Sequence, residues 1–184
     1  MAKLALVSFR LGLTDGVSIE AEKWTTALES LGHEVYTVAG EGPVDVEVPG
    51  LAIDAADDPN IDQLRRALEP ADLVIVENLA SLPLNLDARD AVYEVLKDRA
   101  AIFRHHDLPW QRPHLAHLEG PAHLGPWIHV TINDRSRIEL LQRGIHAVTI
   151  PNHFDCEPPQ GRRDLMRQAI HVKGASRVVM QPTR

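Results

Sequence analysis

The first 38 residues contain the pattern that most constrains the fold. Residues 4–9 form a short apolar run typical of a buried strand. A loop with two glycines follows, and apolar residues then recur at helical spacing as far as Leu31. Gly32 is placed to end this helix, and residues 34–38 favour a second strand. The succession predicts a βαβ unit whose first loop lies where open α/β sheets bind ligands.

The rest of the sequence continues to alternate strand and helix patterns. Strands are expected at residues 44–48, 72–76, 100–103, 127–132 and 147–150, and helices are expected to begin near residues 60, 86 and 135. This alternation predicts an α/β fold with a doubly wound, mainly parallel, Rossmann-like sheet over residues 1–157. Residues 158–184 are expected to hold a linker, a helix at 162–170 and a strand at 177–181. That strand either begins a further domain or pairs at the edge of the same sheet.

Composition narrows the classes of function and location. The 184 residues, 44% of them hydrophobic, suit one ordinary domain with a sizeable core. A formal net charge of -7 argues against a nucleic-acid partner. Cys156 is the single cysteine and cannot form an intrachain disulfide, in keeping with a cytoplasmic protein. We expect neither a transmembrane segment nor a signal peptide.

Polar residues follow several of the predicted strands. Glu77 and Asn78 come after one buried strand, and His105, His106 and Asp107 come after the next. Because the carboxyl ends of parallel strands meet at one edge of a sheet, these side chains are expected to line a ligand site. Glu77 is predicted to accept hydrogen bonds from ligand hydroxyls. One histidine of the pair is predicted to face the ligand, whereas the other could point into the sheet.

The first loop belongs to the same predicted site. Gly12 and Gly16 either let the backbone approach a phosphate or sugar beside a helix N-terminus, or serve a tight turn. Asp15 stands between them as a candidate ligand contact. The loop has neither the G-x-G-x-x-G nor the Walker pattern, so neither a dinucleotide nor ATP is predicted.

The long segment at residues 108–126 supplies further candidates. Trp110 offers a stacking face for a sugar, and Arg112 offers a clamp for a carboxylate or phosphate. Alternatively, Trp110 anchors the segment to the core and Arg112 is solvated. An anionic ligand would be compatible with the arginines near this edge, which are Arg10, Arg104 and Arg112.

Histidines in this part of the chain also allow a metal site. His114 and His117 are three residues apart, as ligands on one helical face would be. Because H-x-x-H is a weak signal without a supporting cysteine pair or H-E-x-x-H, we predict no metal. A His-rich, metal-dependent hydrolase remains an alternative function.

Several short stretches resemble the N-terminal half of GT-B-fold glycosyltransferases, in particular the retaining family 4. They are the loop at 12–16, Leu31-Gly32-His33-Glu34-Val35, His106-Asp107, residues 150–155 and Gln181-Pro182-Thr183-Arg184. His153 and Phe154 depart from the Ile-Pro-Asn-Gly-Val-Asp pattern of that family.

The resemblance implies an acceptor-binding domain of an enzyme that moves a sugar from a nucleotide-sugar donor with retention. It implies that His106 contacts the donor sugar, that Asn152 forms a turn at a hinge, and that no metal or other cofactor is needed. It also implies that a donor-binding C-terminal domain is missing, so these residues alone are expected to be inactive. The alternative from another class is a stand-alone, flavodoxin-like binding or regulatory module. An apolar face left uncovered could drive self-association.

Overall fold

The computed structural model describes residues 1–82, 84–154, 156–157, 161–172 and 177. The chain divides into two compact units, Met1–His153 and Phe154–Arg184. The first contains the sheet. In the second, the described residues include the helix α5 (Arg163–Ala169). The strand predicted at 177–181 lies outside the described residues, apart from its first position, and the predicted boundary after residue 157 stays a prediction.

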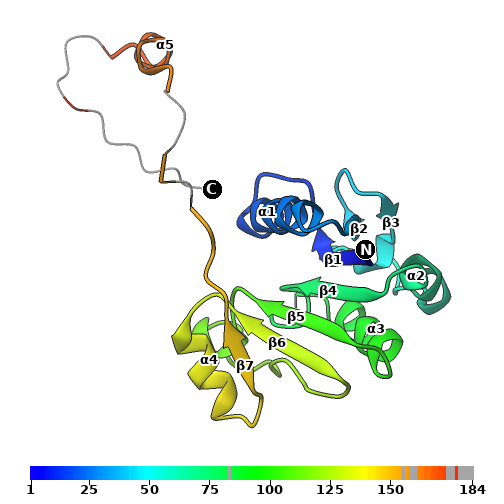
Figure 1. The fold of residues 1–184 in the computed structure, drawn as a ribbon. Helices are drawn as coiled ribbons and strands as arrows, with labels where there is room; N and C mark the ends of the chain where they lie inside the picture. The colour runs from blue at the N-terminus through cyan, green and yellow to red at the C-terminus, as the bar shows by residue number, and fades with distance from the viewer. Residues whose placement is uncertain (83, 155, 158–160, 173–176, 178–184) are drawn as a thin grey trace. The chain divides into compact units, whose positions relative to one another are not determined.

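The described part of the first unit is a seven-stranded sheet in the order β3-β2-β1-β4-β5-β6-β7 (Figure 1). All of its pairings are parallel, which confirms the predicted Rossmann-like α/β fold. The strands are β1 (Lys3–Arg10), β2 (Glu34–Glu41), β3 (Val46–Glu47), β4 (Leu73–Glu77), β5 (Ala101–His105), β6 (Trp127–Thr131) and β7 (Ala147–Thr149).

Helices cover both faces of the sheet, as a doubly wound fold requires. Figure 1 shows α1 on one side and α3 and α4 on the other. The helices of this unit are α1 (Gly16–Ser30), α2 (Ile61–Leu68), α3 (Leu86–Leu96) and α4 (Asp134–Leu141), and the short 3-10 turns are η1 (Pro49–Leu51) and η2 (Pro109–Gln111). No described helix is both long and apolar enough to cross a membrane.

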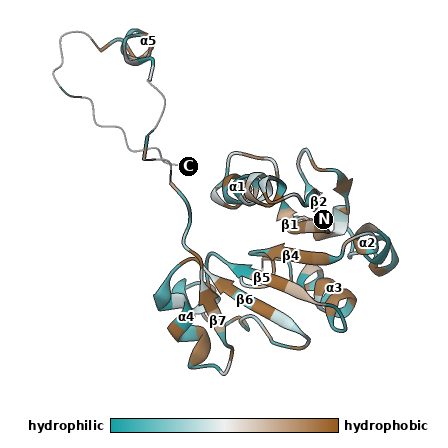
Figure 2. Ribbon diagram, in the orientation of Figure 1, coloured by the Kyte–Doolittle hydropathy of each residue, from teal (hydrophilic) through white to brown (hydrophobic). Residues whose placement is uncertain are grey.

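The core is divided by the sheet into two main layers. The larger cluster lies between the strands and α2 and α3, and includes Leu64, Val92 and Phe103. The smaller cluster packs α1 onto the other face through Ala21 and Trp24. Figure 2 shows the central strands as largely hydrophobic, whereas the helices carry both hydrophilic and hydrophobic residues. These are the patterns of a fully buried sheet and of amphipathic helices.

Asparagine or aspartate side chains fix the start of the helices in this unit. Asn133 accepts a hydrogen bond from the Ser136 backbone N–H and thereby caps α4. The other three caps are Asp15 for α1, Asn60 for α2 and Asn85 for α3.

The α1 face of the sheet is left open at one end. Ile128 is in register with Ile102, which packs in the α1 cluster, so both side chains belong to that face. Ile128 is nevertheless 57% exposed, and Val148 on the neighbouring strand is 51% exposed. The prediction that an uncovered apolar face drives self-association stays open.

The strand order also locates the site. The chain runs from β1 outward to β2 and β3, and then returns to place β4 on the other side of β1. This reversal is the topological switch point, where open α/β sheets bind ligands beyond the carboxyl ends of the strands. The loop after β1 and the residues after β4 flank this point, as the sequence predicted.

Candidate functional site

A buried arginine lies at the centre of the polar groups on this edge. Arg104 is in register with Glu77 on the next strand, so both side chains project onto the face covered by α1. Arg104 Nη1 lies 3.2 and 3.3 Å from the two carboxylate oxygens of Glu77. Its Nη2 donates to Glu20 in α1 at 3.3 Å and to Asn152 after β7 at 2.9 Å. Both Arg104 and Glu77 have no exposed surface.

Arg104 therefore joins four separate segments of the first unit. Its guanidinium carbon also lies 4.5 Å from the centre of the Trp24 ring in α1, a cation–π contact. A charged side chain is buried only when partners compensate its charge and hydrogen-bonding groups. The two carboxylates and the amide of Asn152 compensate the charge and bind both terminal nitrogens of the guanidinium, whereas Arg104 Nε is buried without a hydrogen-bond partner among the described residues.

Lys23 extends the charged cluster. Its Nζ donates to the second carboxylate oxygen of Glu20 at 2.6 Å and to the backbone oxygen of His153 at 2.5 Å. Burial alone would raise the pKa of the Glu20 carboxyl, but the hydrogen bonds from Lys23 and Arg104 hold it below its usual value. The chain after β7 is thus held to α1 and β5 by side-chain contacts.

His106 lies against the same carboxylate. Its Nε2 is 2.9 Å from Glu77 Oε2, and its side chain is 8% exposed. His105 points the other way, is fully buried, and places Nε2 2.9 Å from His129 Nδ1. The two histidines therefore separate to opposite faces, as strand alternation allows, and only His106 joins Glu77.

Asn78 shapes the turn that carries His106. It adopts a positive φ of 57°, which asparagine tolerates better than most residues. Its side-chain oxygen accepts hydrogen bonds from the backbone N–H groups of His106 at 3.0 Å and Asp107 at 3.2 Å. The side-chain oxygen of Asn78 is thus hydrogen-bonded within the protein, and its predicted contact with a ligand stays a prediction.

Replacing Asn78 is expected to destabilise the first unit. Asn78→Ala should lower the free energy of unfolding by about 2–3 kcal/mol, because alanine strains the left-handed backbone and removes the acceptor for two backbone N–H groups. Asn78→Gly, which relieves the backbone strain but still lacks the acceptor, should cost less. Urea denaturation of the three proteins measures both effects, and equal costs for the two variants would rule out a backbone contribution.

The loop after β1 has its own internal contacts. Gly12 has a φ of +73°, and a Cβ atom there would lie 2.7 Å from the Pro43 ring, so this position needs glycine for its turn. Gly16 is the first residue of α1, with open space where a Cβ would stand. Asp15 accepts from the backbone N–H groups of Val17 and Ser18. These contacts explain the loop without a ligand, and its predicted ligand contacts remain untested.

The segment after β5 binds to α4. Trp110 Nε1 donates to Glu139 at 2.8 Å, and the Arg143 guanidinium covers its ring at 3.6 Å. This is the anchoring role considered as an alternative for Trp110. Arg112 donates to Asp107 at 2.7 Å, and its side chain is 46% exposed. Asp107 and Arg112 therefore lie beside His106, but their charged groups are hydrogen-bonded to each other.

The two histidines considered as metal ligands are not held in the interior of the first unit. His114 and His117 lie in exposed turns after η2. Within the described residues, no group of three or more His, Cys, Asp or Glu side chains is arranged to hold a metal ion.

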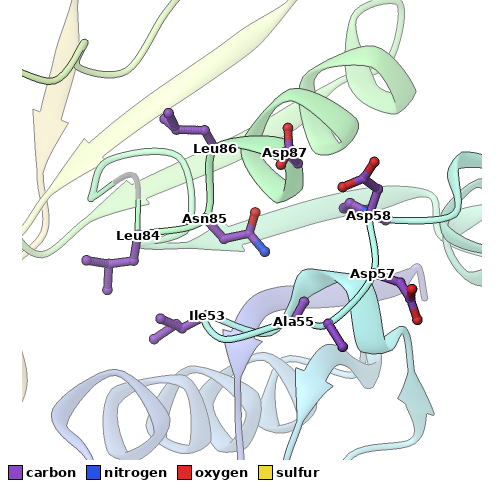
Figure 3. Close-up of a pocket in the computed structure, with 10 residues that line it drawn as sticks. Ile53, Ala55, Asp57, Asp58, Leu84, Asn85, Leu86 and Asp87 are labelled. Carbon is purple, nitrogen blue, oxygen red and sulfur yellow. The ribbon is translucent and has the colours of Figure 1, made fainter.

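A pocket of about 420 Å³ lies on the α2 and α3 side (Figure 3). Its walls come from the segment before α2 and from the start of α3. Three carboxylates line it, which would repel an anionic ligand. None of the predicted site residues contributes to it; the lining residues are Ile53, Ala55, Ala56, Asp57, Asp58, Pro59, Leu84, Asn85, Leu86 and Asp87.

Three partners of Arg104 were not predicted as site residues from the sequence, namely Glu20, Trp24 and Asn152. Asn152 was expected only to form a turn, and the other two were not considered for the site. Arg104 was expected to be available to an anion, whereas it is fully buried and engaged. One feature of the sequence could have indicated the cluster. Arg104 directly follows an apolar strand run, and a charged side chain buried there requires partners.

Two curated proteins are similar to this chain, and both are named mannosylglucosylglycerate synthase. The protein from Thermotoga maritima is 28% identical over 99% of this chain and 53% of its own length. The protein from Petrotoga mobilis is 28% identical over 83% of this chain and 45% of its own length. The chain thus spans about half the length of the curated relatives it matches. No protein-family model matches the sequence.

These similarities support the coarse part of the resemblance inferred from the sequence. A mannosylglucosylglycerate synthase is a glycosyltransferase, and the parallel sheet described above fits a domain of such an enzyme. The GT-B assignment and the retaining mechanism stay predictions.

Proposed function

We propose that this chain is the acceptor-side domain of a retaining, GT-B-type glycosyltransferase that transfers mannose from a nucleotide-sugar donor to glucosylglycerate. The observation that carries the proposal is a similarity to a mannosylglucosylglycerate synthase that extends over 99% of this chain. The polar cluster at the switch point of the sheet is its second support, because that is where folds of this class bind ligands.

A sugar acceptor that carries a carboxylate agrees with the arginines near the carboxyl edge of the sheet. Glycerate carries a carboxylate, for which an arginine is the natural partner. Arg104 is buried and Arg112 is already hydrogen-bonded to Asp107. Arg10 lies at the end of β1. Its Nε is 3.5 Å from Asp15 Oδ2 and its Nη1 is 3.9 Å from Glu41 Oε1. Both distances are longer than those of hydrogen bonds. The Arg10 side chain is 37% exposed, so we assign the acceptor carboxylate to Arg10.

The test is a transfer assay on the complete natural protein that contains these 184 residues. Mannose esters of guanosine and uridine diphosphate serve as donors, and glucosylglycerate serves as acceptor. We expect a product that is heavier by one hexose, identified by mass spectrometry as mannosylglucosylglycerate. Absence of transfer from every mannose donor to this acceptor would refute the proposed function.

The role of Arg10 is tested in the same assay with glucosylglycerol, a neutral acceptor that lacks the carboxylate. Arg10→Met should raise the KM for glucosylglycerate by about tenfold or more, as expected for the loss of a charged hydrogen bond, while that for glucosylglycerol stays unchanged. Arg66→Met on the exposed face of α2 is the matched control. An equal rise for both acceptors would exclude carboxylate recognition by Arg10.

A further inference from the structure

We propose that Glu77 is a positioning residue that holds His106 in the tautomer with its proton on Nε2. The Nδ1 atom of His106 then faces the ligand as a hydrogen-bond acceptor. The inference deepens the proposed function and rests on it for the identity of the ligand, but its geometry is a property of the first unit alone.

The hydrogen bond between His106 and Glu77 determines which imidazole nitrogen carries the proton. His106 Nε2 and Glu77 Oε2 are 2.9 Å apart, which is hydrogen-bonding distance. An ionised carboxylate can only accept a hydrogen bond, so the proton of this bond belongs to the imidazole Nε2. The negative charge of Glu77 is compensated by Arg104, whose Nη1 lies 3.2 Å from the other carboxylate oxygen. Neutral His106 therefore has an unprotonated Nδ1.

The Nδ1 atom of His106 is open to solvent. No described residue forms a hydrogen bond with this atom. In the described part of the chain, the buried side-chain atoms without a hydrogen-bond partner are His33 Nδ1, Arg104 Nε and His105 Nδ1. His106 Nδ1 is not among them, so its ring, although only 8% exposed, reaches solvent through this atom.

The ring of His106 is held in place from two sides. Glu77 Oε2 fixes the Nε2 side, and Asn78 Oδ1 fixes the backbone N–H of His106 at 3.0 Å. Glu77 is itself immobilised, because its backbone oxygen accepts a hydrogen bond from the Ser8 hydroxyl and its carboxylate contacts Arg104. A ring held in this way keeps one orientation toward the ligand, as carboxylate partners of functional histidines do elsewhere.

The chemical consequence is a preference for hydroxyl donors. Neutral His106 can accept a hydrogen bond, or a proton, from a sugar hydroxyl at Nδ1, but it cannot donate one to a sugar or phosphate oxygen. A ring that accepts a proton at Nδ1 keeps its hydrogen bond from Nε2 to Glu77.

The experiment reads the tautomer directly on the 184-residue chain. The protein is labelled with ¹⁵N-histidine, and long-range ¹H–¹⁵N correlation spectra are recorded at alkaline pH, where neutral rings dominate. His106→Gln assigns the signals. We expect the wild-type spectrum to place the proton of His106 on Nε2. A wild-type ring with its proton on Nδ1 would overturn the proposal without the need for any variant.

Two matched variants, each replacing a glutamate by glutamine, distinguish a specific effect of Glu77 on the His106 tautomer from a general disturbance of the cluster around Arg104. In Glu77→Gln the side-chain oxygen still accepts from Arg104, but the new NH₂ group donates to His106 Nε2, so the proton should move to Nδ1. Glu20→Gln removes the other carboxylate on Arg104 and should leave the His106 tautomer unchanged. An unchanged tautomer in Glu77→Gln, or the same change in both variants, would overturn the role of Glu77. Because no sugar is present, these outcomes are independent of whether the proposed transferase reaction is found.

Discussion

Replacing Arg104 with methionine is expected to lower the free energy of unfolding by about 3–5 kcal/mol, the usual cost of breaking a buried ion pair on one side only. Methionine can fill much of the space of the arginine stem, but it leaves Glu77 without its cation. Glu77 is fully buried, and the other side chain that its carboxylate contacts among the described residues is the imidazole of His106. Glu20 is better protected, because Lys23 remains beside it at 2.6 Å. Urea denaturation followed by circular dichroism measures the loss.

Arg112→Met is the matched control for this result. It removes an ion pair of 2.7 Å with Asp107, but both side chains are more than a third exposed, so the cost should stay below about 1 kcal/mol. Adding Glu77→Gln to Arg104→Met removes the uncompensated charge and should restore part of the lost stability. A cost for Arg104→Met no greater than that of Arg112→Met would contradict the view that this arginine holds the edge of the sheet together.

The fold was predictable because its signals are local. Apolar runs such as residues 72–76 identify buried strands, and Gly32 and Gly144 end the helices with positive φ values of 86° and 80°. Alternation of the two patterns then leaves few topologies besides a parallel, doubly wound sheet. The strand limits differ from the prediction by a few residues at most positions; β1, for example, continues to Arg10 and thereby brings that side chain to the switch point.

The site was predictable only in outline, because its contacts are long-range. Residues at strand ends could be placed on one edge from sequence alone, and His106, Glu77 and Asn78 do lie together there. The bond from Arg104 to Glu20 spans 84 residues, and the bond from Arg104 to Asn152 spans 48. No local pattern encodes such pairings. The two possible roles of Trp110 likewise depended on Glu139 in α4, a partner that only the packed fold reveals.

A chain of three histidines leads to the second large effect. His105, which is fully buried, lies 2.9 Å from His129, and His129 Nε2 lies 3.1 Å from Nδ1 of His123, which is exposed. Each contact needs one protonated and one unprotonated nitrogen, a requirement that three neutral rings can meet. Burial, with a smaller contribution from His123, lowers the pKa of His129 to about 4. Burial also holds the pKa of His105 well below its usual value, with smaller contributions from His129 and His106.

The free energy of unfolding is therefore expected to fall as the pH is lowered from 6.5 to 4. In the unfolded chain both histidines take up a proton near pH 6.5, whereas the folded chain resists protonation, so acid favours the unfolded state. For His129 alone the loss should reach about 3 kcal/mol at pH 4, since each unit of pKa shift corresponds to about 1.4 kcal/mol. Well above pH 6.5 both histidines are neutral in the folded and in the unfolded chain, so they contribute no pH dependence there. Urea denaturation at closely spaced pH values measures the slope.

The interval from pH 6.5 to 5 isolates the histidines, because carboxyls with lowered pKa values, such as those of Asp15 and Glu20, act mainly below it. There His129→Gln should reduce the slope toward that of one remaining histidine, each proton accounting for about 1.4 kcal/mol per pH unit at most. His114→Gln, in an exposed turn, should leave the slope unchanged. Because replacing His129 also removes two hydrogen bonds, its stability at pH 7 will fall, and the slope is the decisive quantity. A His129→Gln protein with the wild-type slope would show that this ring is already free to take up protons in the folded state.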